Sequence, residues 1–65
     1  MTKAQIIERI EAIRELAGDN EAAHAEEDRL YKDVLLAIAM GADAPGELAG
    51  EALAARHLDF VRWYA

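Results

Sequence analysis

The stretch from Asn20 to Met40, NEAAHAEEDRLYKDVLLAIAM, decides the fold of this chain. Its apolar residues recur at intervals of three and four, and this pattern predicts one amphipathic helix over residues 20–40. Glu27 lies at the centre of the apolar stripe, where an ordinary helix would carry a leucine. The other members of the stripe are Ala23, Leu30, Val34 and Ile38. Because a bare buried carboxylate is very costly, we expect Glu27 to be paired, hydrogen-bonded or protonated.

The second half of this helix, residues 34–40, is apolar around its whole circumference. Such a helix has to be covered on every side, and two further helices of so short a chain would hardly cover it. The excess face, around Leu36, Ala39 and Met40, is therefore the predicted subunit contact.

The length of the chain also favours association. A chain of 65 residues is marginal as a monomer, because a domain of this size buries only roughly 60% of its unfolded surface. Cysteine is absent, so disulfides cannot add stability. We expect a single domain over residues 1–65 that forms a homo-oligomer, with a homodimer favoured.

A first helix is predicted over residues 3–17. It begins with a capping box, in which Thr2 caps the helix and Gln5 reaches back to it. Its apolar stripe consists of Ile6, Ile10, Ile13 and Ala17. Gly18 is the expected stop, and Asp19 or Asn20 caps the next helix.

A third helix is predicted over residues 45–64, either continuous or restarting after a break. Pro45 suits its first turn, with Asp43 or Ala44 as the cap. A row of small residues in it predicts close approach of a neighbouring helix: Gly46, Gly50 and Ala54. The predicted fold class is therefore all-α, either a small three-helix bundle or a helical hairpin with a C-terminal helical arm.

The charge balance is acidic, with thirteen acidic and seven basic residues and a formal net charge of −6. This disfavours direct nucleic-acid binding, because affinity for nucleic acid comes largely from lysines and arginines that neutralise phosphates. It permits a basic protein partner, or mimicry of nucleic-acid charge. No apolar run approaches the ~20 residues of a membrane span, and no apolar signal core follows Lys3. We expect a cytoplasmic protein that does not bind membranes.

His24, Glu27 and Asp28 form a cluster of titratable side chains, because residues three and four apart are neighbours on a helix. One interpretation is a metal or small-ligand site, since a histidine and a carboxylate at this spacing occur in carboxylate-bridged dimetal bundles. The supply of further ligands is thin, because His57 is the only other histidine. The interpretation that we favour is structural. In it, Glu27 accepts hydrogen bonds from Tyr31, His24 or an arginine across the interface and fixes the register of the helices.

Catalysis finds little support in the sequence. A desolvated carboxylate beside an imidazole can act as a general acid or base. However, the chain has no serine and no cysteine, and its sole threonine, Thr2, lies at a helix cap. A phosphate-binding glycine loop is also absent from the sequence. We predict no enzyme activity and no cofactor; a metal-dependent hydrolase at the titratable cluster is the remaining enzyme alternative.

The segment 59–65, DFVRWYA, holds three of the four aromatic residues. Aromatic residues with an arginine are typical of binding hot spots. We expect Phe60 and Trp63 to complete the core, and Arg62 to pack over an aromatic ring or to pair with Glu27 or Asp28. The predicted binding residues are therefore His24, Glu27, Asp28, Arg62, Trp63 and Tyr64.

The chain from His24 to Ala65 resembles small orphan helical proteins encoded by phages and prophages. The resemblance lies in His24-x-x-Glu27-Asp28, Leu30, Val34-Leu35, Ala37-Ile38-Ala39 and the end Asp59-Phe60-x-Arg62-Trp63-Tyr64-Ala65. It implies an accessory protein in the cytoplasm of a bacterial host that binds a host or defence component, and it implies no established activity.

Together these features predict a non-catalytic, acidic, helical protein–protein interaction module. A small-ligand or metal-binding protein that uses His24, Glu27 and Asp28 is the alternative. Mimicry of nucleic-acid charge by the acidic surface is a third hypothesis.

Overall fold

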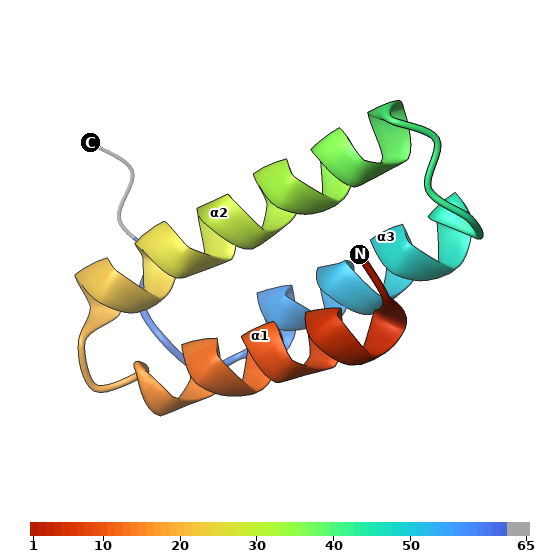
Figure 1. Ribbon diagram of the computed structural model, residues 1–65. Helices are drawn as coiled ribbons and strands as arrows, with labels where there is room; N and C mark the ends of the chain where they lie inside the picture. The colour runs from red at the N-terminus through yellow and green to blue at the C-terminus, as the bar shows by residue number, and fades with distance from the viewer. Residues whose placement is uncertain (63–65) are drawn as a thin grey trace.

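The computed structural model describes residues 1–62, which form three α-helices and a short 3₁₀ helix, with no β-strand among them (Figure 1). The α-helices are α1 (Lys3–Glu15), α2 (Asn20–Ala39) and α3 (Pro45–Leu53), and the 3₁₀ helix is η1 (Ala54–His57). Each α-helix packs against the other two. In Figure 1, α2 runs antiparallel to both α1 and α3. The predicted all-α class is confirmed, in the form of a small three-helix bundle.

The first two helices begin at the caps that the sequence indicates. The Gln5 backbone N–H donates to Thr2 Oγ1 over 3.2 Å, and the Thr2 backbone N–H donates to Gln5 Oε1 over 2.8 Å, which completes the capping box. Asp19 caps α2 by accepting a hydrogen bond of 3.1 Å from the Ala22 backbone N–H. The first helix ends at Glu15, slightly before the expected residue 17, in a tight turn that leads to Asp19.

The connection between α2 and α3 contains two residues with positive φ. Gly41 has a φ of +92°, a conformation that glycine adopts readily. Ala44 has a φ of 51° and serves as the N-cap of α3, without a side-chain hydrogen bond. Of the two expected caps, Asp43 and Ala44, the structure uses Ala44, the residue directly before Pro45. An alanine side chain has no atom that can accept a hydrogen bond.

The predicted third helix over residues 45–64 is wrong beyond its first half. α3 ends at Leu53, η1 adds one tight turn, and Leu58 is extended with a φ of −67° and a ψ of 140°. The chain then returns to the start of α2, where the Val61 backbone N–H donates to Asn20 Oδ1 over 3.2 Å. Tertiary contacts of residues 58–62 thus override the local preference for helix. Trp63 and Tyr64 lie outside the described residues.

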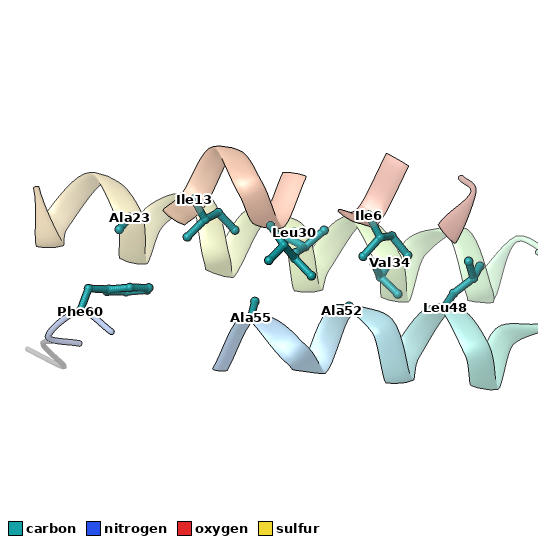
Figure 2. Close-up of a cluster of buried hydrophobic side chains, with 10 residues drawn as sticks. Ile6, Ile13, Ala23, Leu30, Val34, Leu48, Ala52, Ala55 and Phe60 are labelled. Atoms are coloured by element: carbon teal, nitrogen blue, oxygen red, sulfur yellow. The ribbon is translucent and has the colours of Figure 1, made fainter. Parts of the chain in front are cut away.

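The core combines isoleucines of α1 with aliphatic side chains of α2, α3 and η1 and with one phenylalanine after η1 (Figure 2). Its buried apolar members are Ile6, Ile10, Ile13, Ala23, Leu30, Val34, Leu48, Ala52, Ala55 and Phe60. The expectation that Phe60 joins the core is confirmed, since its exposed fraction is 8%. Phe60 belongs to residues 58–62, which follow η1 and are called the tail segment below. Its burial holds the tail segment against the bundle. None of the helices in residues 1–62 has the length and apolar character of a membrane span.

Among residues 1–62, the predicted row of small residues does not mark a helix contact. A methyl group added at Gly46 or Gly50 would meet no atom of these residues within 4 Å. Both glycines therefore face open space, and close packing against a neighbouring helix of the same chain does not explain them.

Candidate functional site

Glu27 lies inside the bundle, as its position in the apolar stripe predicts, with an exposed fraction of only 3%. Arg62, which follows η1 in the chain, forms a bidentate ion pair with it. Arg62 Nε donates to Glu27 Oε1 over 2.9 Å, and Nη2 donates to Oε2 over 2.8 Å. A bidentate arginine–carboxylate pair of this kind is directional as well as strong. The expected partners of Glu27 are Tyr31, His24 and an arginine. In the structure an arginine of the same chain, Arg62, donates to both oxygens of Glu27.

The rest of the Arg62 guanidinium is bound by backbone carbonyls. Nη2 also donates to the Ala55 carbonyl oxygen over 3.1 Å, and Nη1 donates to the carbonyl oxygens of Leu58 and Phe60 over 3.3 and 3.2 Å. The guanidinium carbon lies 3.9 Å from the centre of the Phe60 ring, within the range of a cation–π contact. The expectations that Arg62 covers an aromatic ring and pairs with Glu27 are therefore both confirmed.

Tyr31 lies one helical turn after Glu27 and shares its environment. Burial, the negative charge of Glu27 and a hydrogen bond to Glu27 raise the pKa of Tyr31 from 10.0 to about 12, while Arg62 and Arg56 act in the opposite direction. All three dominant causes disfavour the phenolate. The hydroxyl therefore stays protonated at neutral pH and can donate to the carboxylate.

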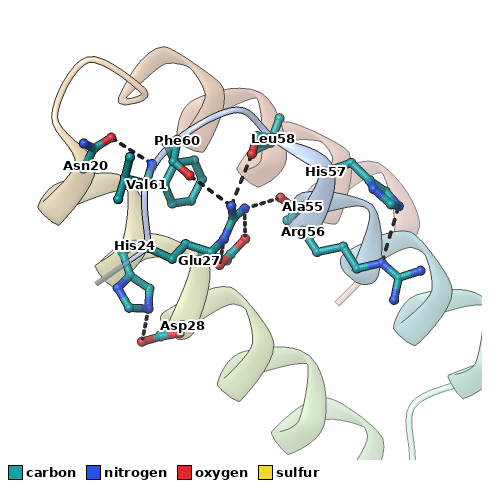
Figure 3. Close-up of polar contacts among 11 residues, drawn as sticks. Asn20, His24, Glu27, Asp28, Ala55, Arg56, His57, Leu58, Phe60 and Val61 are labelled. Atoms are coloured by element: carbon teal, nitrogen blue, oxygen red, sulfur yellow. Dashed lines mark hydrogen bonds and ion pairs between the residues drawn. The ribbon is translucent and has the colours of Figure 1, made fainter. Parts of the chain in front are cut away.

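The predicted titratable cluster is divided between two sites. Glu27 faces Arg62, whereas His24 faces Asp28, with 3.4 Å between His24 Nε2 and Asp28 Oδ2 (Figure 3). Asp28 is largely exposed. Within residues 1–62, histidine, aspartate and glutamate side chains form no group of three that could hold a metal ion. The geometry of Glu27 does not favour its use as a metal ligand, because both of its oxygens accept hydrogen bonds from Arg62.

The predicted subunit contact lies on the surface of α2. Leu36 and Met40 have exposed fractions of 56% and 80%, and Ala39 is also exposed. The second half of α2 is therefore incompletely covered by the rest of the described chain, as its apolar circumference implies.

A second apolar surface, which sequence reasoning missed, is a groove between α2 and α3. Its volume is about 280 Å³, and it is lined by Tyr31, Val34, Leu35, Ala49, Ala52 and Leu53. Leu35 and Leu53 are 67% and 48% exposed, so the groove carries apolar surface that the described chain leaves uncovered. Both leucines follow directly after a buried residue, Val34 or Ala52. This neighbouring position of each leucine can be read from the sequence. Only the packing of α2 on α3, however, brings the two leucines to one groove.

Comparisons of this protein with protein-family models, with curated proteins and with solved structures each found no match.

Proposed function

We propose that this protein is a non-catalytic helical interaction module that associates with a second copy of itself through the α2–α3 groove. The groove and its exposed leucines, Leu35 and Leu53, are the observation that carries the proposal. A two-fold dimer needs one surface that fits itself. The α2–α3 groove can fit itself, because the exposed leucines of one copy can enter the apolar groove of the other copy.

The distribution of charge supports a second copy as the occupant. Each chain carries a net charge of −6, so two copies repel each other over most of their surfaces. None of the described residues that line the groove is acidic. The exposed acids of α1, Glu8, Glu11 and Glu15, lie on another helix, while α2 and α3 carry the exposed acids Glu21, Asp28 and Glu47 outside the set of lining residues. Self-association through the groove therefore avoids placing these acidic surfaces against each other.

Such a dimer would present acidic helix surfaces outward, which suits a basic protein partner. The resemblance to small phage and prophage proteins fits this role, and we propose a host or defence protein in the bacterial cytoplasm as that partner. The predicted contact at Leu36, Ala39 and Met40 is continuous with Leu35 along α2, so a second copy in the groove can cover part of it as well.

The test is the mass of the protein in solution, measured by sedimentation equilibrium over a range of concentrations. We expect the natural chain to be a dimer and the Leu35→Lys and Leu53→Lys variants to be monomers. Ile7→Lys is the matched control, because Ile7 is an apolar residue of α1 that is 43% exposed. Surface substitutions of this kind change folding stability by only about 0.5 kcal/mol. A natural chain that stays monomeric, or a Leu35→Lys variant that stays dimeric, would contradict the proposal.

A further inference from the structure

Residues of α2, η1 and the segment after η1 place hydrogen-bond acceptors around the Arg62 guanidinium group. An arginine side chain has five N–H donors in a fixed plane. Among the described residues, the acceptors are both oxygens of the Glu27 carboxylate and the carbonyls of Ala55, Leu58 and Phe60. The Phe60 ring covers one face of the plane at 3.9 Å. The surrounding residues therefore match the charge, the hydrogen-bond pattern and the flat shape of a guanidinium group.

The walls of this site also have contacts that do not involve Arg62. Phe60 is held in the core, and the Val61 backbone N–H is held by Asn20 Oδ1. The Leu58 backbone N–H donates to the Ala55 carbonyl over 3.1 Å, which fixes the turn after η1. Glu27 is fixed by α2. Truncation of Arg62 at its β-carbon would therefore leave an acceptor-lined hole rather than a collapsed one.

The hole would also be reachable from solvent. The Arg62 side chain is 20% exposed, whereas the Glu27 side chain is 4% exposed. The stem of Arg62 thus runs from the surface to a buried carboxylate, and a ligand of similar width can follow the same path. An ammonium group would fill the site poorly, because it has three donors in a tetrahedral arrangement and no flat face.

We propose that Glu27, the carbonyls of Ala55, Leu58 and Phe60, and the Phe60 ring form a guanidinium-binding site. Arg62 fills this site within its own chain. When Arg62 is absent, the site binds a guanidinium group from outside, either a small guanidinium compound or the arginine side chain of another polypeptide.

The test uses the Arg62→Ala variant and methylguanidinium as the probe, with methylammonium and urea as matched controls at equal ionic strength. We expect methylguanidinium to raise the Tm of the variant in a saturable way, with a Kd of about 1–10 mM, and to leave the natural chain unchanged. Methylammonium should give at most one tenth of that affinity. Nα-acetyl-arginine amide is the second probe, and comparable binding would show that the site accepts an arginine of another chain.

Two further variants show whether the effect belongs to this site. In the double variant Glu27→Gln with Arg62→Ala, saturable stabilisation by methylguanidinium should disappear. Arg14→Ala removes an arginine from an exposed pair with Glu11, and it should gain no response to the probe. If Arg62→Ala does not fold alone, the readout is helix content by circular dichroism, which methylguanidinium should restore. Equal effects of methylguanidinium and methylammonium, or no saturable effect in either readout, would overturn the proposal.

Discussion

At the scale of single residues, the ion pair of Glu27 and Arg62 dominates the interior of the bundle. Its two members are 35 positions apart in sequence, and Arg62 is the only arginine seen to reach Glu27 among the described residues. A buried pair is weak evidence for net stability, because each charge has lost its water. We expect the pair to contribute to specificity instead, since it forms only in a register of the helices that brings the carboxylate to Arg62.

Loss of one partner of this pair should cost more than replacement of both. We expect Glu27→Gln to lower the free energy of unfolding by about 2–4 kcal/mol, because it leaves the Arg62 guanidinium without a countercharge. The double variant Glu27→Leu with Arg62→Leu should recover much of that loss, since an apolar pair has no desolvation penalty. Urea unfolding of the natural chain, Glu27→Leu, Arg62→Leu and the double variant measures the coupling between the two positions. Additive effects would show that the two side chains do not act as a pair.

The raised pKa of Tyr31 gives a second prediction at this scale. Since the pKa is about 12 in the folded chain and 10.0 for an ordinary tyrosine, the contribution of Tyr31 to stability is fully present below pH 10. It is lost as the pH rises through 12, because the unfolded chain then binds fewer protons than the folded one. The difference in unfolding free energy between the natural chain and Tyr31→Phe should therefore shrink across this range. Ionisation of Tyr31 near pH 10 in the folded protein, measured as phenolate absorbance lost in Tyr31→Phe, would contradict this.

At the scale of elements, α1 and α2 could be predicted closely because their end signals are local. Thr2 with Gln5, and Asp19 before α2, specify where the helices begin, whatever packs around them. The course of the chain after Leu53 could not be predicted in the same way. It depends on the burial of Phe60 and on a partner 35 residues away; the sequence indicates both contacts but not the residue at which the helix has to end for them to form.

The same distinction applies to the candidate site. The burial of Glu27 follows from helix periodicity alone, but the choice of its partner among several donors requires the tertiary structure. His24 and Asp28 lie one helical turn apart, as the sequence predicts, and they face each other. Their spacing in the sequence does not reveal that Glu27 faces Arg62 instead. The α2–α3 groove depends on how two helices pack, so its leucines could be identified only after that packing was known.

Two glycines allow a matched test of helix and turn requirements. Gly50 lies inside α3 with open space around its α-carbon, so Gly50→Ala should raise the free energy of unfolding by about 0.5–1 kcal/mol. Gly41 has a φ of +92°, so Gly41→Ala should lower it by about 1 kcal/mol or more, although it too has open space. Thermal or urea unfolding measures both. A loss of stability in Gly50→Ala would point to a contact at α3 that the single chain does not contain.

At the scale of the whole molecule, the short chain and its uncovered leucines connect stability to concentration. If the folded protein is a dimer, its Tm should rise by about 3–5 °C for each tenfold increase in protein concentration, since association stabilises only the folded state. Leu35→Lys should have a Tm that does not change with concentration. Calorimetry at several concentrations measures both chains. A concentration-independent Tm in the natural chain would argue against the dimer even if particles larger than a monomer were present.

The long sequence separation between Glu27 and Arg62 has a consequence for the protein during its synthesis. A ribosome adds the residues of α1 and α2 before it adds residue 62, so Glu27 is made well before the guanidinium with which it pairs. Packing of Glu27 into an apolar interior without that guanidinium would have a desolvation penalty. We therefore expect the final packing of α1 and α2 around Glu27 to follow the synthesis of Arg62.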